Sequence, residues 1–232
     1  MNVTKRDNAT WLFERETSGA NFPHSSESFW SALFGLFLTY LGGRGNSEES
    51  RLKIWVITDP AAPSFRESCS IDVGSVGFDD IAVEPGRLDG KYFREGIVLP
   101  PEARRCEPDL FVRLRATGPD APTHLLIENK TIRAAFRQDQ ELKYLSLMNA
   151  INLEGVRPMM LLLTSALPEE KNKVLFAARS LQHKLLDKFG LLLWEDIIRH
   201  MNRTGFSPAG LDVREWQRYT DAFRDLMEAA RA

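Results

Sequence analysis

The chain has 232 residues, 43% of them hydrophobic and 27% charged, with a formal net charge of −2. This length and balance indicate a soluble globular protein of one domain, with enough chain to bury a sizeable core. The charge excludes a basic field over the whole molecule of the kind that attracts nucleic acid. A local basic groove is nevertheless enough to hold a phosphate backbone.

The cysteines and the N-terminal residues give the expected location. Cys69 and Cys106 are far apart, which excludes a disulfide framework and a zinc pattern and favours free thiols in a reducing cytoplasm. Residues 5–8 are polar or charged, so no signal peptide is expected. The most apolar early run, residues 29–41, is too short to span a bilayer. A cytoplasmic protein without a membrane partner is predicted.

The first predicted element is a helix that follows a short lead-in over residues 1–24. Residues 25–27, Ser-Ser-Glu, provide good N-caps and an acid for the first turn. Apolar side chains recur at helical spacing over 30–41, and the glycines at 42–43 end the run. Other apolar residues cover the remaining faces, so the helix is expected to be buried on most sides.

Short β-like segments follow this helix. They are residues 54–57, 71–73, 81–83, 96–99, 110–114 and 124–127. The last two are joined by residues 116–122, which are rich in Gly, Pro and Asp. Two strands joined by such a turn predict an antiparallel hairpin.

Helices alternate with strands in the second half of the chain. A polar helix is expected over 134–151 and a buried strand over 159–164. A helix from Pro168 to Phe189 would stop at Gly190, followed by a strand over 191–194 and a helix through Met201. Asp212 and Glu215 resemble a capping box for a last helix. The order predicts an α/β (α+β) domain over residues 25–232 with a central mixed sheet flanked by helices.

Three charged residues meet at one end of the predicted hairpin. Glu128 and Lys130 are two apart on a strand and share a face, while Asn129 points to the other. If positions near 115 pair with positions near 123, those near 109 pair with those near 129, so Asp109 arrives beside Glu128 and Lys130. Charges at the end of a central apolar strand need pairing or a metal, and such breaks in sequence logic mark functional sites.

The chemistry of this trio is coherent. Two neighbouring carboxylates repel each other, and a divalent cation resolves the repulsion. Magnesium prefers oxygen ligands and binds through one or two carboxylates plus substrate phosphate. Such an ion polarises a phosphate and lowers the pKa of a bound water. Lys130 can orient that water or stabilise the transition state.

Pro108-Asp109, a turn, and Glu128-Asn129-Lys130 after an apolar strand together resemble the PD-(D/E)XK signature of restriction-endonuclease-like and RecB-like nucleases. Gln140 and Tyr144, on the following helix, match the QxxxY motif of the RecB-like branch. These two residues are one helical turn apart and face the same side. The family often has an acid on its first core helix, and Glu27 is the matching position.

The resemblance implies an αβββαβ core over about 25–165, with extra C-terminal helices over 168–231. It further implies Mg²⁺- or Mn²⁺-dependent cleavage of DNA, less often RNA, and many such nucleases pair as homodimers to cut both strands. Asp109, Glu128, the Asn129 backbone carbonyl and Glu27 would hold the metal. Lys130 would be catalytic. Gln140 and Tyr144 would support the site or touch the nucleic-acid backbone.

Basic residues gather near the motif. Arg133, Arg137 and Lys143 lie on or near the helix that carries Gln140, and they could hold phosphates. An ordinary charged surface explains them equally well. Asp79-Asp80 and Glu84 form a second acidic group, interpreted as a solvated loop or as a helper of the site.

Other interpretations of the trio remain open. Asp109, Glu128 and Lys130 could form a surface salt-bridge cluster at a sheet edge. The fold could also serve as a non-cutting nucleic-acid-binding or assembly module. In a third alternative, an unrelated α/β protein carries the motif by accident. For Tyr144 a core position, and for Glu27 a favourable interaction with the helix dipole, are nearly as well supported as a role in the site. His24 is interpreted as a solvated loop residue, and His124 lies away from the metal end.

Overall fold

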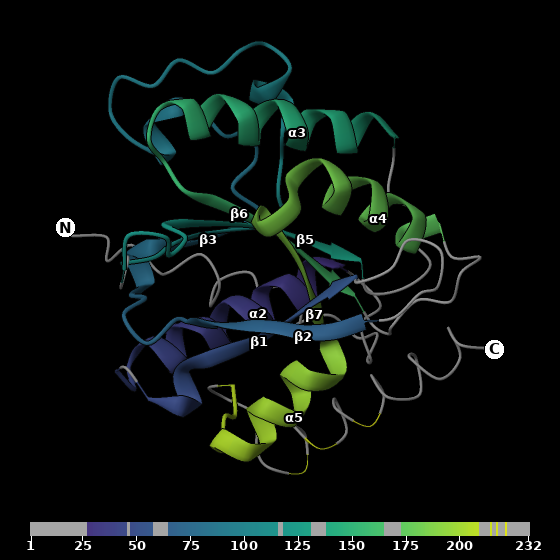
Figure 1. Ribbon diagram of the computed structural model, residues 1–232. Coiled ribbons are helices and arrows are strands. Elements are labelled where there is room, and N and C mark those ends of the chain that lie inside the picture. Colours follow the sequence, from purple (N-terminus) through teal and green to yellow (C-terminus); the bar gives the residue numbers. More distant parts are fainter. Residues whose placement is uncertain are drawn as a thin grey trace.

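The computed structural model describes residues 27–45, 47–57, 65–115, 118–130, 138–164 and 173–208, together with Arg214, Gln217 and Asp221. These residues form a mixed α/β fold in which helices cover both faces of a seven-stranded sheet (Figure 1). In chain order the helices and strands are α2 (Glu27–Gly42), β1 (Arg51–Ile57), β2 (Phe65–Asp72), β3 (Ile81–Val83), β4 (Leu110–Arg113), β5 (His124–Lys130), α3 (Gln138–Leu153), β6 (Pro158–Thr164), α4 (Lys173–Leu185), β7 (Phe189–Leu193) and α5 (Trp194–Thr204).

The strands lie in the order β2-β1-β7-β6-β5-β4-β3. The central strands β5, β6 and β7 run parallel, and the strands on either side of them pair antiparallel. Every residue of β5, β6 and β7 is buried. Continuous apolar runs suit parallel strands whose two faces are both covered, so the predicted central mixed sheet is confirmed.

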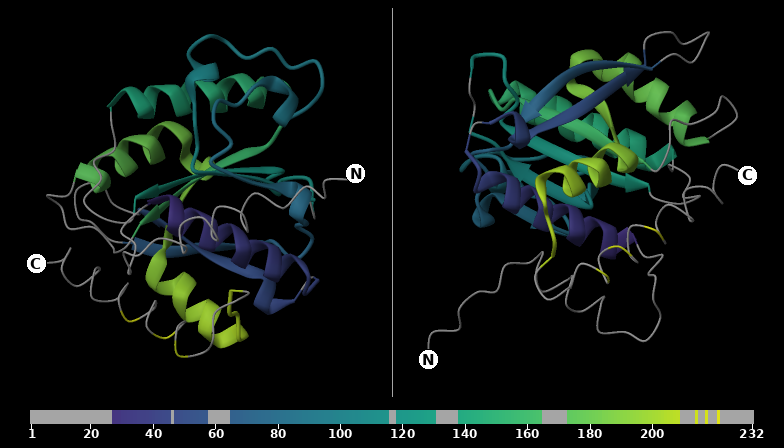
Figure 2. Two further views of the ribbon diagram at one scale, coloured as in Figure 1. Left: turned by 180° about the vertical axis from the view of Figure 1, so that it is seen from behind. Right: turned by 90° about the horizontal axis from the view of Figure 1, so that it is seen from below.

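Two hydrophobic cores lie on opposite faces of this sheet. Figures 1 and 2 show α2 and α5 on one face and α3 and α4 on the other. Leu125 and Ile127 of β5 pack in the core beneath α2 and α5, whereas Leu126 packs in the core beneath α3 and α4. This division follows from the alternation of side chains along a strand.

Helix α2 is buried on most sides, as its sequence predicts. Its rings Trp30 and Phe34 pack edge-on against Trp194 of α5, with ring centroids 5.5 Å and 5.9 Å apart. A helix that is apolar all round needs a neighbour on every face, and here the sheet and α5 provide them. None of the helices in the described part of the chain is long and apolar enough to cross a membrane.

Two predictions for the loops and ends of elements were wrong. Residues 96–99 form no strand. Gly190 does not stop a helix, because α4 ends at Leu185 and Gly190 lies inside β7. A Cβ at residue 190 would lie 2.3 Å from Cγ2 of Ile54, so the glycine permits close packing of two elements within the sheet.

Several predictions lie outside the described residues. These are the lead-in over 1–24, the first residues of the helix predicted from 134, the start of the helix at Pro168, and the capping box of Asp212 and Glu215. The last predicted helix also lies outside them, apart from Arg214, Gln217 and Asp221. The remaining predicted helices and strands are confirmed, with ends that differ by a few residues. The strand predicted over 71–73 is the end of the longer strand β2.

Gly42, at the end of α2, should be intolerant of a side chain. A Cβ there would lie 1.7 Å from the backbone carbonyl oxygen of Val76, so the backbone must move. We expect Gly42→Ala to lower the free energy of unfolding by about 1–3 kcal/mol in urea denaturation. Gly43→Ala is the matched control, because its Cβ would meet nothing closer than 3.6 Å. Equal stabilities of the two variants would contradict this packing.

Candidate active site

The register of the β4–β5 hairpin places Asp109 opposite Glu128. Leu110 pairs with Ile127 and Arg113 with His124, one residue away from the sequence-based pairing of 109 with 129. Residues directly opposite in an antiparallel pair share a face, whereas a slip of one residue reverses every side chain. The observed register therefore puts Asp109 on the same face as Glu128 and Lys130.

Glu128 is the most enclosed charge of this group, with 1% of its surface exposed. Its Oε1 lies 2.7 Å from the Lys130 ammonium and also accepts a hydrogen bond from the Gln140 amide. Its Oε2 accepts a hydrogen bond from the Tyr144 hydroxyl at 2.5 Å. A carboxylate out of water needs such partners, and both of its oxygens have them.

Helix α3 supplies two of these donors from one side. Gln140 and Tyr144 are four residues apart and lie one above the other on the helix surface. Burial, followed by the charge of Glu128, raises the pKa of Tyr144 well above its usual value. The phenol is therefore protonated at neutral pH and donates to the carboxylate. Sequence-based reasoning had left a core role for Tyr144 nearly as open as a site role.

Cys106 lies in the same core as Tyr144 and is a buried free thiol, as predicted. Burial and the nearby charge of Glu128 raise the pKa of this thiol. It is therefore neutral at physiological pH and is a poor nucleophile. The side chain of Cys69 lies outside the described residues.

Asn129 points to the opposite face and binds two helices. Its amide nitrogen donates to the Ser31 hydroxyl of α2 at 3.0 Å, and its amide oxygen accepts from the Trp194 indole of α5 at 3.1 Å. The side chain is fully buried. Sequence-based reasoning missed this role. The signal was a serine in an otherwise apolar helix, which needs a polar partner once it is buried.

Asp109, the third member of the charged trio, is half-buried. Its Oδ2 accepts a hydrogen bond from the backbone N–H of Asn129 at 2.6 Å. Its own backbone carbonyl accepts from the N–H of Glu84, at 2.8 Å. Asp109 is thereby fixed between the ends of β3 and β5.

Glu84 is the acid that the sequence had grouped with Asp79 and Asp80. It lies at the same edge of the sheet as Asp109, has φ of 45°, and accepts a hydrogen bond from Ser28 of α2. A non-glycine residue with positive φ is uncommon and marks a constrained position. Asp79 and Asp80 instead contact Arg113 at the other end of β4. Glu84 therefore lies near one end of β4, and Asp79 and Asp80 lie near the other.

The other predicted ligands are less defined. Glu27 is the first residue of α2, next to Ser28, but its side chain lies outside the described residues, as do Arg133 and Arg137. Lys143 contacts Asp139 within α3 at 3.0 Å, and this hydrogen bond lowers the pKa of Asp139. Lys143 therefore forms an ion pair within its own helix.

His124 lies at the opposite end of β5, in contact with the rings of Phe93 and Phe111. Burial, followed by the charge of Arg113, lowers its pKa to about 4. The imidazole is therefore neutral at physiological pH. This agrees with the expectation that His124 lies away from the charged trio.

The oxygen atoms at this site are ligands of the kind that a hard cation prefers. Asp109, Glu128 and the Asn129 carbonyl offer oxygen atoms only, and Mg²⁺ and Mn²⁺ prefer such ligands. Within the described residues no group of three or more His, Cys, Asp or Glu side chains gathers as a metal site. A two-carboxylate site is still enough for Mg²⁺, which completes its shell with water and substrate phosphate. Lys130 is the cation that contacts Glu128 here.

The chain was also compared with protein-family models, curated proteins and solved structures. None of the three comparisons gives a match. Its function must therefore be inferred from its own residues.

Removing the Tyr144 hydroxyl should destabilise the protein. Tyr144→Phe leaves a buried carboxylate short of one donor, so we expect a loss of about 1–3 kcal/mol in the free energy of unfolding at pH 7. Tyr92→Phe is the control, because no hydrogen bond of the Tyr92 hydroxyl occurs within the described residues. Urea denaturation measures both. A Tyr144→Phe variant as stable as the control would contradict the contact.

The stabilities of the wild type and of Tyr144→Phe should also depend differently on pH. The pKa of Tyr144 is raised in the folded state, whereas an unfolded tyrosine ionises near pH 10. Above about pH 10 the unfolded chain therefore releases a proton that the folded state keeps, so the wild type loses stability as pH rises. Tyr144→Phe lacks this contribution, and the stability gap between the two proteins should narrow in alkaline solution. A constant gap would contradict the raised pKa.

Proposed function

We propose that this protein is a metal-dependent nuclease of the PD-(D/E)XK type that hydrolyses phosphodiester bonds of DNA. The observation that carries the proposal is the gathering of Asp109, Glu128 and Lys130 on one face at the end of β5. Gln140 and Tyr144, the residues that match the QxxxY motif, both contact Glu128. Five residues from three elements and their flanks thus converge on one point.

The order of elements supports a restriction-endonuclease-like core. Leaving out the β1–β2 hairpin, the chain runs α2, β3, β4, β5, α3, β6. This is the αβββαβ succession implied by the resemblance. The strands β3 to β6 are also neighbours in the sheet, with β5 and β6 parallel. The β1–β2 hairpin and β7 extend the sheet beyond β6.

In this proposal Asp109, Glu128 and the Asn129 carbonyl hold Mg²⁺ or Mn²⁺. When bound, the ion polarises a phosphate and makes a bound water a better nucleophile at neutral pH. Glu128 can meet such an ion only if its contact with Lys130 is shared or released, since Lys130 and Gln140 both contact Oε1.

The protein's own residues would orient the metal ligands and stabilise the charge that develops on the phosphate. The Lys130 ammonium lies at the edge where substrate would arrive and can donate to the negative charge that develops on the phosphate. Tyr144 and Gln140 act on Glu128 and are positioning residues. The hydrogen bond from Asn129 N–H fixes Asp109 Oδ2. Such preorganisation contributes to catalysis because little reorganisation is needed during the reaction.

A non-catalytic module on the same fold is the second candidate. The observation that favours it is the closed state of Glu128, with every oxygen engaged and the charge neutralised by Lys130. A buried ion pair of this kind can serve structure alone. Metal binding separates the candidates: calorimetry with Mn²⁺ should show binding to the wild type and much weaker binding to Asp109→Asn. Absence of binding to the wild type would favour the module.

Cleavage tests the first candidate directly. The purified wild type should nick plasmid DNA with Mg²⁺ or Mn²⁺ and lose this activity in chelator. Lys130→Ala should lower the rate by about 10²–10³-fold, because a donor to the transition state is lost. Lys91→Ala is the control, since Lys91 is exposed and pairs only with Asp89 in the described part of the chain. Full activity of a folded Lys130→Ala variant would refute the assigned site.

A further inference from the structure

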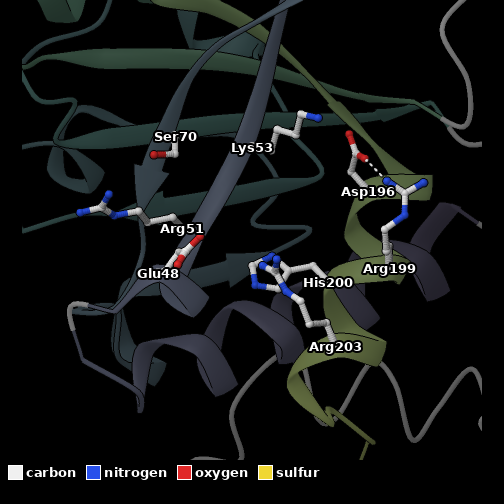
Figure 3. Close-up of a pocket in the computed structure, with 8 residues that line it drawn as sticks. All are labelled: Glu48, Arg51, Lys53, Ser70, Asp196, Arg199, His200 and Arg203. Carbon is white, nitrogen blue, oxygen red and sulfur yellow. Dashed lines mark hydrogen bonds and ion pairs between the residues drawn. The ribbon is translucent and has the colours of Figure 1, made fainter.

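A pocket of about 380 Å³ lies between strand β1 and helix α5, away from the candidate active site (Figure 3). Its size is within the range of small-ligand sites. Four of its eight lining residues are cations, namely Arg51, Lys53, Arg199 and Arg203. Two carboxylates, Glu48 and Asp196, also line it, so the formal charge is 4 − 2 = +2. The whole chain carries −2, so positive charge is concentrated here.

The cations of this pocket fall into two kinds. Arg199 is held by Glu195 and Asp196, at 3.0 Å and 3.1 Å. Arg51 and Arg203 are exposed, and neither side chain has an ion pair or hydrogen bond within the described residues. In Figure 3 Arg203 extends from α5 towards β1, whereas the Arg51 guanidinium is turned away from α5. Two guanidinium groups are therefore available to an anion, and guanidinium suits a phosphate in particular.

Asp196 also organises the wall formed by β1. Its Oδ2 accepts a hydrogen bond from the Trp55 indole at 2.7 Å. The ammonium of Lys53 lies 4.1 Å from the centre of the Trp55 ring, a distance typical of cation–π contact. The Asp196 carboxylate thus holds Arg199 directly. It also holds the Trp55 ring against which Lys53 packs. Its own negative charge is largely compensated by Arg199.

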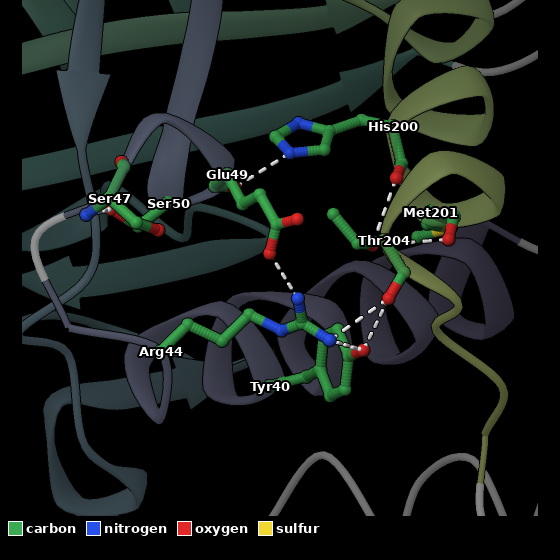
Figure 4. Close-up of polar contacts among 8 residues, drawn as sticks. All are labelled: Tyr40, Arg44, Ser47, Glu49, Ser50, His200, Met201 and Thr204. Carbon is green, nitrogen blue, oxygen red and sulfur yellow. Dashed lines mark hydrogen bonds and ion pairs between the residues drawn. The ribbon is translucent and has the colours of Figure 1, made fainter.

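The floor of the pocket is fastened by polar contacts between α5 and the 3₁₀ helix η1 (Glu48–Ser50) (Figure 4). His200 Nε2 donates to the backbone carbonyl of Glu49 at 2.7 Å. Burial lowers the pKa of His200, so the ring makes this bond as a neutral imidazole. The Arg44 guanidinium contacts the Glu49 carboxylate and donates to the Thr204 carbonyl. These bonds hold the two walls at a fixed separation.

The pocket lies at the same edge of the sheet as Lys130. Lys130 pairs with Thr164, and Thr164 pairs with Leu193 at the end of β7. Because β1 runs antiparallel to β7 with Trp55 opposite Leu191, Lys53 falls opposite Leu193. Lys53 and Lys130 are therefore level, on strands three spacings apart, or roughly 14 Å.

We propose that this pocket binds a backbone phosphate of the polynucleotide whose cleavage is proposed above, on which this inference rests. Measured parallel to the axis of a duplex, roughly 14 Å spans about four phosphates of one strand, because each strand carries one phosphate per 3.4 Å of axis. A strand lying along this edge can therefore reach both sites. Arg203 binds the phosphate from α5, and the exposed Arg51 side chain turns towards it from β1. Lys53 and Arg199 add positive charge.

Binding of a labelled DNA duplex, followed by fluorescence anisotropy in chelator, tests the pocket without cleavage. Arg51→Ala/Arg203→Ala should weaken binding about tenfold and lower the magnitude of the salt slope by about 0.9, since the contact with one phosphate is lost. The control, Lys91→Ala/Arg94→Ala, also removes two cations, near the opposite edge of the sheet, where Phe93 contacts His124. The exposed positions should leave the thermal unfolding midpoint unchanged in both variants.

Equal duplex affinity of the two double variants would overturn the inference. A free phosphorylated ligand is the other source of the same chemistry, and titration with a nucleoside monophosphate by calorimetry distinguishes it. Pocket-dependent binding of the monophosphate, with duplex affinity unchanged in the pocket variant, would also overturn the inference. If the wild type cleaves DNA in either case, the proposed function stands alone. If the wild type neither binds nor cleaves DNA, both fail.

Discussion

The pleat of β5 at Glu128, Asn129 and Lys130 is the constraint on which the structure depends. All three side chains are buried, with exposures of 1%, 0% and 9%, although none of them is apolar. Alternation sends the charged pair to the face of α3 and the amide to the face of α2 and α5. Each face must then satisfy what it receives, because unpaired polar groups in a core are strongly destabilising. Helix α3 does so with Gln140 and Tyr144, and α2 and α5 do so with Ser31 and Trp194.

This constraint couples the site to the rest of the fold. A shift of α3 would remove two donors from Glu128, and a shift of α2 or α5 would leave the Asn129 amide unpaired. The register between β4 and β5 is fixed in the same way, because Asp109 accepts a hydrogen bond from the backbone of β5. Side chains held by packing and by hydrogen bonds keep their geometry without help from a ligand. The fold itself therefore holds the carboxylates in place.

Sequence reasoning could place the local elements and the charged trio, because the hairpin, the QxxxY helix and the buried strands depend on patterns a few residues long. It could not fix features that depend on residues far apart in the chain. Gly190 follows a helical pattern and looks like a helix stop, but Ile54, 136 positions away, leaves room only for glycine in a strand. Glu84 looked like part of a loop acid group, and only the ends of β3 and β4 show that it lies beside Asp109. The exact partner of Asp109 could be predicted only to within one residue for the same reason, since the turn over 116–122 was not determined by composition.

The low net charge of the chain now has a different meaning. A charge of −2 seemed to count against a polynucleotide partner, but electrostatic attraction depends on where charges lie and not on their sum. At this edge of the sheet two of the acids are neutralised, Glu128 by Lys130 and Asp196 by Arg199. The cations of β1 and α5 have no such full compensation, because they outnumber the carboxylates of their pocket. In the proposed function, a phosphate backbone would therefore meet net positive charge at this pocket, although the molecule as a whole is slightly acidic.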